Sequence, residues 1–196
     1  MTDDRSIDVA ERVLGPLARR EAPFGARTTY RVGGRAALLV EVTVEAELPT
    51  LVDALAASGA PVFVLGKGSN LLVADAGFLG VVVVLGDGWE SVVVDRDRGV
   101  VDAGGATALP VLARRCAAAS VTGLEWAVGI PGSVGGAVRM NAGGHGCETV
   151  DRLLDARVLR LDEAREERLD SADLELSYRY SVLRPCDLVL DARYRP

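Results

Sequence analysis

Two glycine-rich segments of the sequence combine residue types that could bind an anionic ligand. The first, Gly66-Lys67-Gly68-Ser69-Asn70, directly follows an apolar run. Glycines allow positive φ angles and close approach of the backbone, so successive N–H groups can converge on a diphosphate, and the serine and asparagine add side-chain donors. The segment matches neither the dinucleotide-binding fingerprint, whose third glycine is missing, nor the Walker loop, whose lysine precedes serine or threonine. A glycine hairpin turn is the alternative interpretation of this spacing.

The second segment runs from Gly129 to Ala137 and is followed by Met140 to Gly146. Ordering so many glycines costs conformational entropy, and a ligand that needs close backbone approach would explain that cost. A flexible surface loop is the alternative, but such a loop would not need the apolar side chains that alternate with the glycines here. The second segment therefore favours a ligand-binding loop more strongly than the first.

A third cluster, Tyr178-Arg179-Tyr180-Ser181, places a guanidinium between two phenols near the expected start of a late strand. In a strand, Arg179 and the serine would share one face and the tyrosines the other. Arg179 could hold a carboxylate or stabilise a developing enolate, and a solvated arginine is the alternative. Two single residues have open alternatives as well. His145 could contact a ligand or be solvated, and Glu125 could bind a polar ligand group or accept backbone N–H groups at a turn.

The elements that position these residues are predicted by the apolar periodicity. The pattern at 7–20 predicts an amphipathic helix that is interrupted or bent near its Gly-Pro pair. A strand at 37–42, a helix at 45–58 that stops at Gly59 and a strand at 61–65 follow. This succession is typical of a parallel β-α-β unit with a helical crossover.

The later elements predict a change to antiparallel pairing. Residues 91–94 and 99–102 form a predicted hairpin, and the glycine-dense stretch at 123–146 is too long for a simple connector. Together with the first part, they indicate an α+β fold with mixed parallel and antiparallel sheets. The remaining predicted elements are strands at 71–73, 81–85, 154–161 and 188–194, a helix at 109–119, and an acidic segment at 162–176.

The composition excludes several classes of function. With 196 residues, of which 49% are hydrophobic and 26% charged, we expect one compact unit, or two subdomains that share a core. The net charge of −6 and the 5% of aromatic residues argue against nucleic acid as a partner. Phosphate backbones attract clusters of lysine and arginine, and single-stranded bases need aromatic stacking surfaces.

Cysteine, histidine and hydropathy patterns narrow the location and the chemistry. Cys116, Cys147 and Cys186 are an odd number at wide spacing, which favours a reducing cytoplasm over a disulfide framework. His145 is the only histidine, so a multi-histidine zinc site cannot be built and no metal is expected. No run approaches the ~20 apolar residues of a membrane span, so we expect neither membrane insertion nor export.

Taken together and in this order, the motifs resemble the UDP-N-acetylenolpyruvoylglucosamine reductases of bacterial cell-wall synthesis. The resemblance implies a vanillyl-alcohol-oxidase-type FAD-binding fold (also called the PCMH type). It implies an N-terminal helix at 1–20 and two subdomains, 21–86 and 87–196, with the flavin between them. The segments that carry the resemblance are 28–34, 65–75, 103–105, 123–125, 129–137, 140–146 and 178–181.

The resemblance also implies the cofactors and the reaction. FAD is expected to bind noncovalently and to receive hydride from NADPH, and the flavin then passes hydride to UDP-N-acetylglucosamine enolpyruvate, giving UDP-N-acetylmuramate. Arg179 matches the arginine that helps to stabilise the enolate, so we expect it to be catalytic and, with Tyr178, to bind the substrate. The residues that the resemblance places around the cofactor are Gly66, Lys67, Gly68, Ser69, Asn70, Gly129, Ile130, Pro131, Gly132, Ser133, Gly135, Gly136 and Asn141.

Two departures from the family pattern leave part of the reaction unassigned. The family's serine proton donor, and the glutamate that helps the arginine to stabilise the enolate, lie in a substrate domain beyond the Tyr-Arg-x-Ser segment, whereas this sequence ends at Pro196. We therefore expect the reductase chemistry to be incomplete in this chain, and Ser181 occupies a different family position from the proton donor. Gly144-His145 also stands where the family commonly has Ala-Tyr.

Two alternatives to the reductase follow from these departures. The chain could be a flavin-binding module without this activity. It could also be an oxidase of the wider flavin superfamily, some of whose members attach the flavin covalently through a histidine, and here only His145 could do so.

Overall fold

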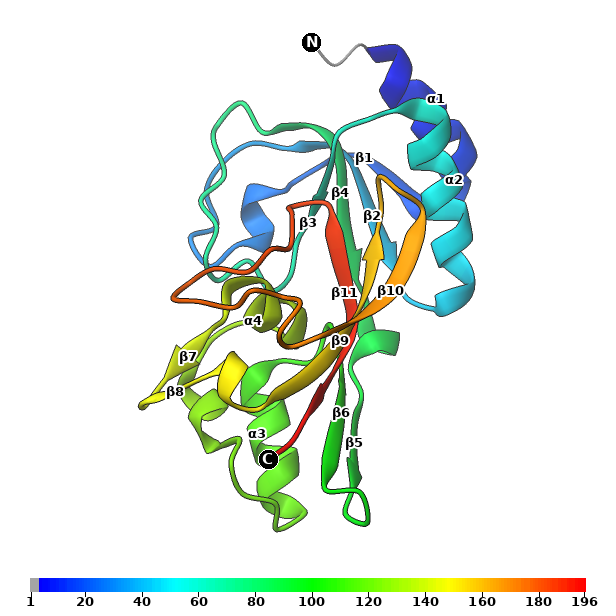
Figure 1. The fold of residues 1–196 in the computed structure, drawn as a ribbon. Helices are drawn as coiled ribbons and strands as arrows, with labels where there is room; N and C mark the ends of the chain where they lie inside the picture. Colours follow the sequence, from blue (N-terminus) through cyan, green and yellow to red (C-terminus); the bar gives the residue numbers. More distant parts are fainter. Residues whose placement is uncertain (1–3) are drawn as a thin grey trace.

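The first sheet is built from four strands in the N-terminal part of the chain (Figure 1). The structure, a computed structural model, describes residues 4–196. The strand order is β1-β2-β4-β3, in which β2, β4 and β3 are parallel and β1 is antiparallel to β2. The predicted β-α-β unit is confirmed, with β4 lying between the two strands that the helix connects. The strands are β1 (Ala18–Ala22), β2 (Ala36–Val42), β3 (Val62–Val64) and β4 (Phe78–Leu85).

Two helices cover one face of this sheet. Helix α1 (Asp4–Leu14) packs against α2 (Leu48–Ser58), which ends where Gly59 adopts φ +60° and its N–H bonds to the carbonyl of Leu55. A left-handed residue at this position is usually glycine because a Cβ is disfavoured there. The predicted end of this helix is therefore confirmed.

The predicted interruption of the first helix near its Gly-Pro pair is confirmed, but the prediction that the helix continues to residue 20 was wrong. Helix α1 ends at Leu14, a 3-10 turn follows at Gly15–Leu17, and Ala18–Ala22 forms the edge strand β1. Gly15 has φ +54° and Pro16 has no N–H to donate, so the helical hydrogen bonds stop there and pairing with β2 replaces them. Residues 1–3 of the predicted N-terminal segment lie outside the described residues.

The second sheet has five antiparallel strands in the order β10-β9-β11-β6-β5 (Figure 1). The predicted hairpin is confirmed, because Val94 pairs with Val101 across its polar tip. The predicted strand at 71–73 is instead a loop, and β10 lies in the acidic segment where no strand was predicted. The strands are β5 (Val92–Asp95), β6 (Val100–Gly104), β9 (Leu153–Arg160), β10 (Arg165–Asp170) and β11 (Asp187–Tyr194).

Helices α3 (Leu109–Ala118) and α4 (Val134–Met140) pack on one face of the second sheet. Alternate residues of β9 point to opposite faces, so Val158 packs against these helices and Leu159 packs on the other side. A short hairpin of β7 (Gly143–Gly144) and β8 (Cys147–Glu148) follows α4. The other 3-10 turns in the described part of the chain are Gly25–Arg27, Glu45–Glu47, Asp87–Trp89, Glu125–Gly129 and Thr149–Asp151.

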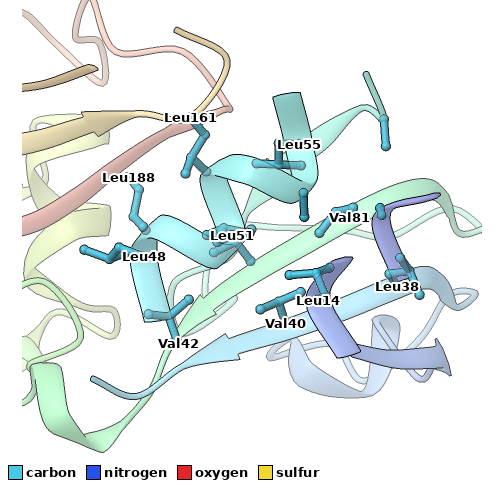
Figure 2. Close-up of a cluster of buried hydrophobic side chains, with 14 of the residues drawn as sticks. Leu14, Leu38, Val40, Val42, Leu48, Leu51, Leu55, Val81, Leu161 and Leu188 are labelled. Carbon is cyan, nitrogen blue, oxygen red and sulfur yellow. The ribbon is translucent and has the colours of Figure 1, made fainter. Parts of the chain in front are cut away.

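One hydrophobic cluster connects the two sheets (Figure 2). Leu51 of α2 is fully buried among side chains of β2 and β4. Leu161, directly after β9, and Leu188 of β11 reach the same cluster. Burying one such leucine contributes about 1.5–3 kcal/mol, so a shared cluster fixes the sheets relative to each other. Within residues 4–196, no helix has both the length and the apolar character to cross a membrane.

Candidate functional site

The two glycine-rich loops that the sequence analysis selected lie against each other. The loop Gly66–Asn70 follows β3, and the Ser69 hydroxyl donates to the carbonyl of Pro131 at 3.0 Å. A Cβ placed on Gly66 would lie 2.8 Å from Oγ of Ser133. Residues more than 60 positions apart in sequence thereby form one continuous backbone surface.

Both loops carry backbone donors that the protein leaves unused. Within residues 4–196, the N–H groups of residues 66–70, and those of Gly132 and Ser133, make no hydrogen bond to a protein acceptor. The next N–H groups are paired, since that of Gly135 donates to the Gly105 carbonyl at 2.9 Å and that of Gly136 to Oγ of Ser133 at 3.2 Å. Backbone N–H groups are strong donors that a protein normally satisfies, so a run of unpaired ones suits an anionic ligand.

The loops line two adjoining cavities between the sheets. The larger has a volume of about 510 Å³ and is lined by both loops, Met140, Gly143 and Arg179. The smaller, of about 210 Å³, is mainly apolar and includes Leu85, Pro185 and Leu188. Gly66, Ser133 and Gly136 line both, so the glycine loops stand where the two cavities meet.

Most of the residues predicted around the cofactor line these cavities, and two do not. Gly129 and Asn141 line neither cavity. Gly135 lines the smaller one. In this structure the Ser69 hydroxyl donates to the carbonyl of Pro131, and its predicted role as a donor to the cofactor stays a prediction. The predicted residues that line the larger cavity are Gly66, Lys67, Gly68, Ser69, Asn70, Ile130, Pro131, Gly132, Ser133 and Gly136.

Two residues of the first loop are also held by the protein itself. Gly68 has φ +66°, and a Cβ there would lie 2.6 Å from the carbonyl oxygen of Arg27. Glycine is therefore required by the chain's own packing as well as by any ligand. Lys67 forms an ion pair with Glu90, with 2.5 Å between Nζ and Oε1. This lysine is half-exposed, so the pair contributes little to stability and can rearrange.

Arg179 lies at the mouth of the larger cavity, although the segment that carries it is not a strand as predicted. Ser177 and Tyr180 pair with each other across a turn, and Arg179 has φ +54°. Nη1 donates to the carbonyl of Asn141 at 3.3 Å and Nη2 to that of Gly143 at 3.2 Å. Because the segment is a turn, Arg179 and Ser181 do not share one face of a strand as predicted.

Two residues that contact Arg179, Tyr178 and Asn141, differ in their exposure to solvent. Its guanidinium carbon lies 5.1 Å from the centre of the Tyr178 ring, a cation–π distance. Tyr178 is 80% exposed and lines neither cavity. Its predicted contact with the substrate stays a prediction. Asn141 is fully buried and its side chain bonds to Glu148, Ser177 and Val150, so it supports the loop and Arg179 in this structure.

Three further residues that the sequence analysis considered are placed outside the cavities. Glu125 accepts the N–H of Gly123 at 2.7 Å, as expected for a carboxylate at a turn. His145 is exposed and lines a separate hollow with Trp126, so it is not in the two cavities that meet at the glycine loops. Ser181 is buried and donates to the carbonyl of Arg139 at 2.7 Å, so its proton is already committed.

The wall of the smaller cavity contains residues that no sequence pattern selected. Arg184 and Asp187 line it, and the carbonyl of Pro185 accepts the N–H of Val64 at 2.9 Å. This contact ties the segment before β11 to β3 of the other sheet. Hydrogen bonding to Asp187 raises the pKa of Arg184, so the arginine stays charged. Gly105, which also lines this cavity, belongs to a segment that carried the family resemblance. Arg184 and Pro185 belong to no sequence motif that could have predicted their place in the site.

The unpaired backbone donors between the two sheets define a domain suited to an anionic ligand, and comparison with known proteins identifies its class. The model of the family described as "FAD binding domain" matches residues 36–165. The chain belongs to this FAD-binding family. The matched range contains both glycine-rich loops.

Within that class, the chain is similar to UDP-N-acetylenolpyruvoylglucosamine reductases, as the sequence motifs predicted. It is 40% identical to the one from Synechococcus sp. (strain RCC307) over 90% of this chain and 58% of the relative. The crystal structure of the enzyme from Thermus caldophilus matches with a TM-score of 0.77 and 34% identity, over 90% of this chain and 61% of that chain. The chain thus spans about three fifths of the length of these relatives.

A more distant structure confirms the predicted fold class. The BBE-like 1 protein of Physcomitrella patens matches with a TM-score of 0.63 and 19% identity, over 95% of this chain and 44% of that chain. At this identity the likeness concerns the fold alone. Together with the family match, it confirms the α+β FAD-binding fold with mixed sheets.

Proposed function

We propose that the chain binds FAD noncovalently across the two cavities. The observation that carries the proposal is the run of unpaired N–H groups at residues 66–70, 132 and 133, which lies where the cavities meet. A diphosphate held there would accept these hydrogen bonds without any lysine or arginine cluster. Because Gly66 and Ser133 line both cavities, a cofactor bound through its diphosphate can place one ring system in each.

We further propose that the domain serves an NADPH-dependent reduction of UDP-N-acetylglucosamine enolpyruvate to UDP-N-acetylmuramate, a peptidoglycan precursor. The similarity to reductases of that name supports this reaction. A bound flavin supplies the hydride that is added to the enolpyruvyl double bond. The chain's own contribution is to orient the substrate and to stabilise negative charge as it develops.

Arg179 is the residue that we propose for this electrostatic role. Its guanidinium lines the larger cavity, and its two hydrogen bonds to carbonyls leave further N–H groups for a ligand. A planar fork of donors matches a carboxylate or an enolate better than a point charge does. Tyr178, stacked under the guanidinium, is proposed to contact the substrate beside it.

The same proposal gives the domain limits and the location. We propose subdomains at 21–86 and 87–196. The second range contains the whole five-stranded sheet, and the first contains the four-stranded sheet except for residues 18–20 of β1. An enzyme that uses NADPH and a UDP-sugar works where both are made, so we propose that the protein is cytoplasmic. The family's serine proton donor is not assigned to any residue of this chain, and Ser181 is unsuited to that role.

Titration with FAD tests the first part of the proposal. The folded chain should quench the fluorescence of added FAD and shift its absorbance, and dialysis against denaturant should release the flavin unmodified. A folded protein that leaves the spectrum of excess FAD unchanged would disprove flavin binding. Flavin that stays attached after denaturation would contradict noncovalent binding.

An anaerobic experiment then tests the reaction. The FAD-loaded chain is reduced chemically, mixed with UDP-N-acetylglucosamine enolpyruvate and followed by flavin absorbance. Reoxidation with formation of UDP-N-acetylmuramate supports the reductase, at whatever rate this chain alone permits. Bound flavin that never reoxidises with this substrate, even when the sequence is extended to the full length of its relatives, favours a flavin-binding module without this activity.

A further inference from the structure

Glu148 is the carboxylate beside Arg179, and the proposed function gives it no role. It lies on β8, opposite Gly143 of β7. Its Oε1 lies 3.7 Å from Nη1 of Arg179, and its Oε2 accepts Nδ2 of Asn141 at 2.9 Å. Each oxygen of this carboxylate therefore serves a different partner in the same small network.

Asn141 is the buried centre of this network. Its Nδ2 also donates to the carbonyl of Ser177 at 3.1 Å, and its Oδ1 accepts the N–H of Val150 at 3.0 Å. Its own backbone carbonyl accepts Nη1 of Arg179. Asn141 thus ties the turn that carries Arg179 to the hairpin that carries Glu148. It adopts φ +41°, a left-handed conformation that asparagine tolerates better than most residues.

Arg179 needs such support because its side chain is long and partly exposed. The side chain is 43% exposed, and its two hydrogen bonds, at 3.2 and 3.3 Å, go to neutral carbonyls. An unrestrained arginine side chain loses rotamer entropy when a ligand fixes it. Among residues 4–196, Glu148 is the acidic residue that forms an ion pair with Arg179. It therefore offsets part of the positive charge that faces the cavity.

We propose that Glu148 is a positioning residue that acts with Asn141. It holds the Arg179 guanidinium at the mouth of the larger cavity and reduces its attraction for small anions. The N–H groups on the free side of the fork still bind a carboxylate that the rest of a substrate has placed there. This inference rests on the proposed function, because it gives Arg179 an anionic substrate group to bind.

Arginine side-chain NMR of the purified chain tests the proposal, with and without FAD. The Nε–H signal of Arg179 is identified by its loss in Arg179→Lys. Glu148→Gln keeps an oxygen for Asn141 but removes the charge, so the guanidinium should rotate faster about its Nε–Cζ bond. Acetate, used as the probe anion at low ionic strength, should then shift the Arg179 signal with about two- to fivefold higher affinity, the range of a partly exposed ion pair.

Glu175→Gln is the matched control, because it removes the same charge from an exposed residue four positions before Arg179. It should leave rotation and acetate affinity unchanged. If Glu148→Gln is folded and both quantities equal those of the parent chain, the proposal is wrong. If that variant does not fold, Glu148→Asp replaces it. Aspartate retains the charge, but its shorter side chain moves the carboxylate away from Arg179. Guanidinium rotation should therefore increase, while acetate affinity stays within about twofold of the parent chain. Unchanged rotation would refute the positioning role.

These measurements separate the inference from the proposed function. They need no turnover, and the Arg179 signals can be followed without flavin. Failure to bind FAD would disprove the proposed function while the guanidinium data still decide the role of Glu148. Normal FAD binding with unaltered Arg179 signals in Glu148→Gln would disprove the positioning role alone.

Discussion

Two substitutions at Gly136 should separate folding stability from cofactor binding. It lies within α4 and lines both cavities. A Cβ there would meet only Oγ of Ser133, at 3.4 Å, within a radius of 4 Å. The added carbon therefore enters the space that we propose for FAD and meets little of the protein itself.

The magnitudes follow from helix propensity and from overpacking. Alanine is favoured over glycine in a helix by about 0.5–1 kcal/mol, so Gly136→Ala should raise the free energy of unfolding of the flavin-free chain by that amount. The larger Gly136→Leu fills more of the cavity. If crowding costs a bound ligand about 1–3 kcal/mol, as overpacking does in cores, FAD affinity should fall roughly 5- to 150-fold.

Chemical denaturation of the flavin-free chain and fluorescence titration with FAD measure the two effects separately. Ala117→Gly on α3 is the control, because it exchanges the same two residues on an exposed helix position that lines neither cavity. It should lower stability by about 1 kcal/mol and leave FAD affinity unchanged. If Gly136→Leu folds and binds FAD as tightly as the parent chain, the cavities at α4 are not the cofactor site.

Four further predictions concern other parts of the molecule. Arg179→Lys should leave FAD affinity within about twofold but slow flavin reoxidation by the enolpyruvyl substrate in a chain extended to the length of its relatives, and equal reoxidation rates would refute its catalytic role. Gly68→Val should lower the melting temperature as well as FAD affinity, because its Cβ meets the Arg27 carbonyl, and a loss of FAD affinity alone would contradict this packing. Burial by itself would raise the pKa of Asp155, but hydrogen bonds from Arg193 and Arg168 outweigh it and hold that pKa below the ordinary 3.8. This stabilisation is present above pH 3.8 and is lost as the pH falls through the lowered pKa. Asp155→Asn should therefore lower the free energy of unfolding by about 1–3 kcal/mol at pH 7 and flatten the acid limb of its pH dependence. An unchanged acid limb would refute the assignment. The 196-residue chain should reduce the enolpyruvyl substrate slowly. No residue of it is assigned as the proton donor, and a positioned acid commonly supplies ~10²–10⁴-fold in rate. Rapid anaerobic flavin reoxidation with product formation would show that a proton donor lies within the chain.

Several features of this protein could be predicted from the sequence because their causes are local. Apolar periodicity and the glycine at 59 predicted α2 and its end, and runs of valine on both sides of a polar tip predicted the β5–β6 hairpin. The two glycine-rich loops were identified because glycine, which has no Cβ, allows a ligand to approach the backbone closely. Their order along the chain was specific enough to indicate the FAD-binding class.

Other features were decided only by contacts between residues far apart in sequence. Strand β10 has the sequence of an exposed charged segment, and it is a strand because its side chains pair with β9, as Glu166 does with Arg157. The helix predicted up to Arg20 gave way to an edge strand once β2 offered hydrogen-bond partners. Local propensity differs by less than about 1 kcal/mol per residue for most residue types, so such pairing overrides it.

The tertiary structure also decided the arrangement of the site. A local pattern could suggest that Arg179 matters, but not that it lies in a left-handed turn between the carbonyls of Asn141 and Gly143. The wall at Arg184 exists because Pro185 bonds to β3 across the sheets. A site between two sheets is formed by long-range packing, and the spacing of residues along the chain carries no measure of the distances that this packing creates.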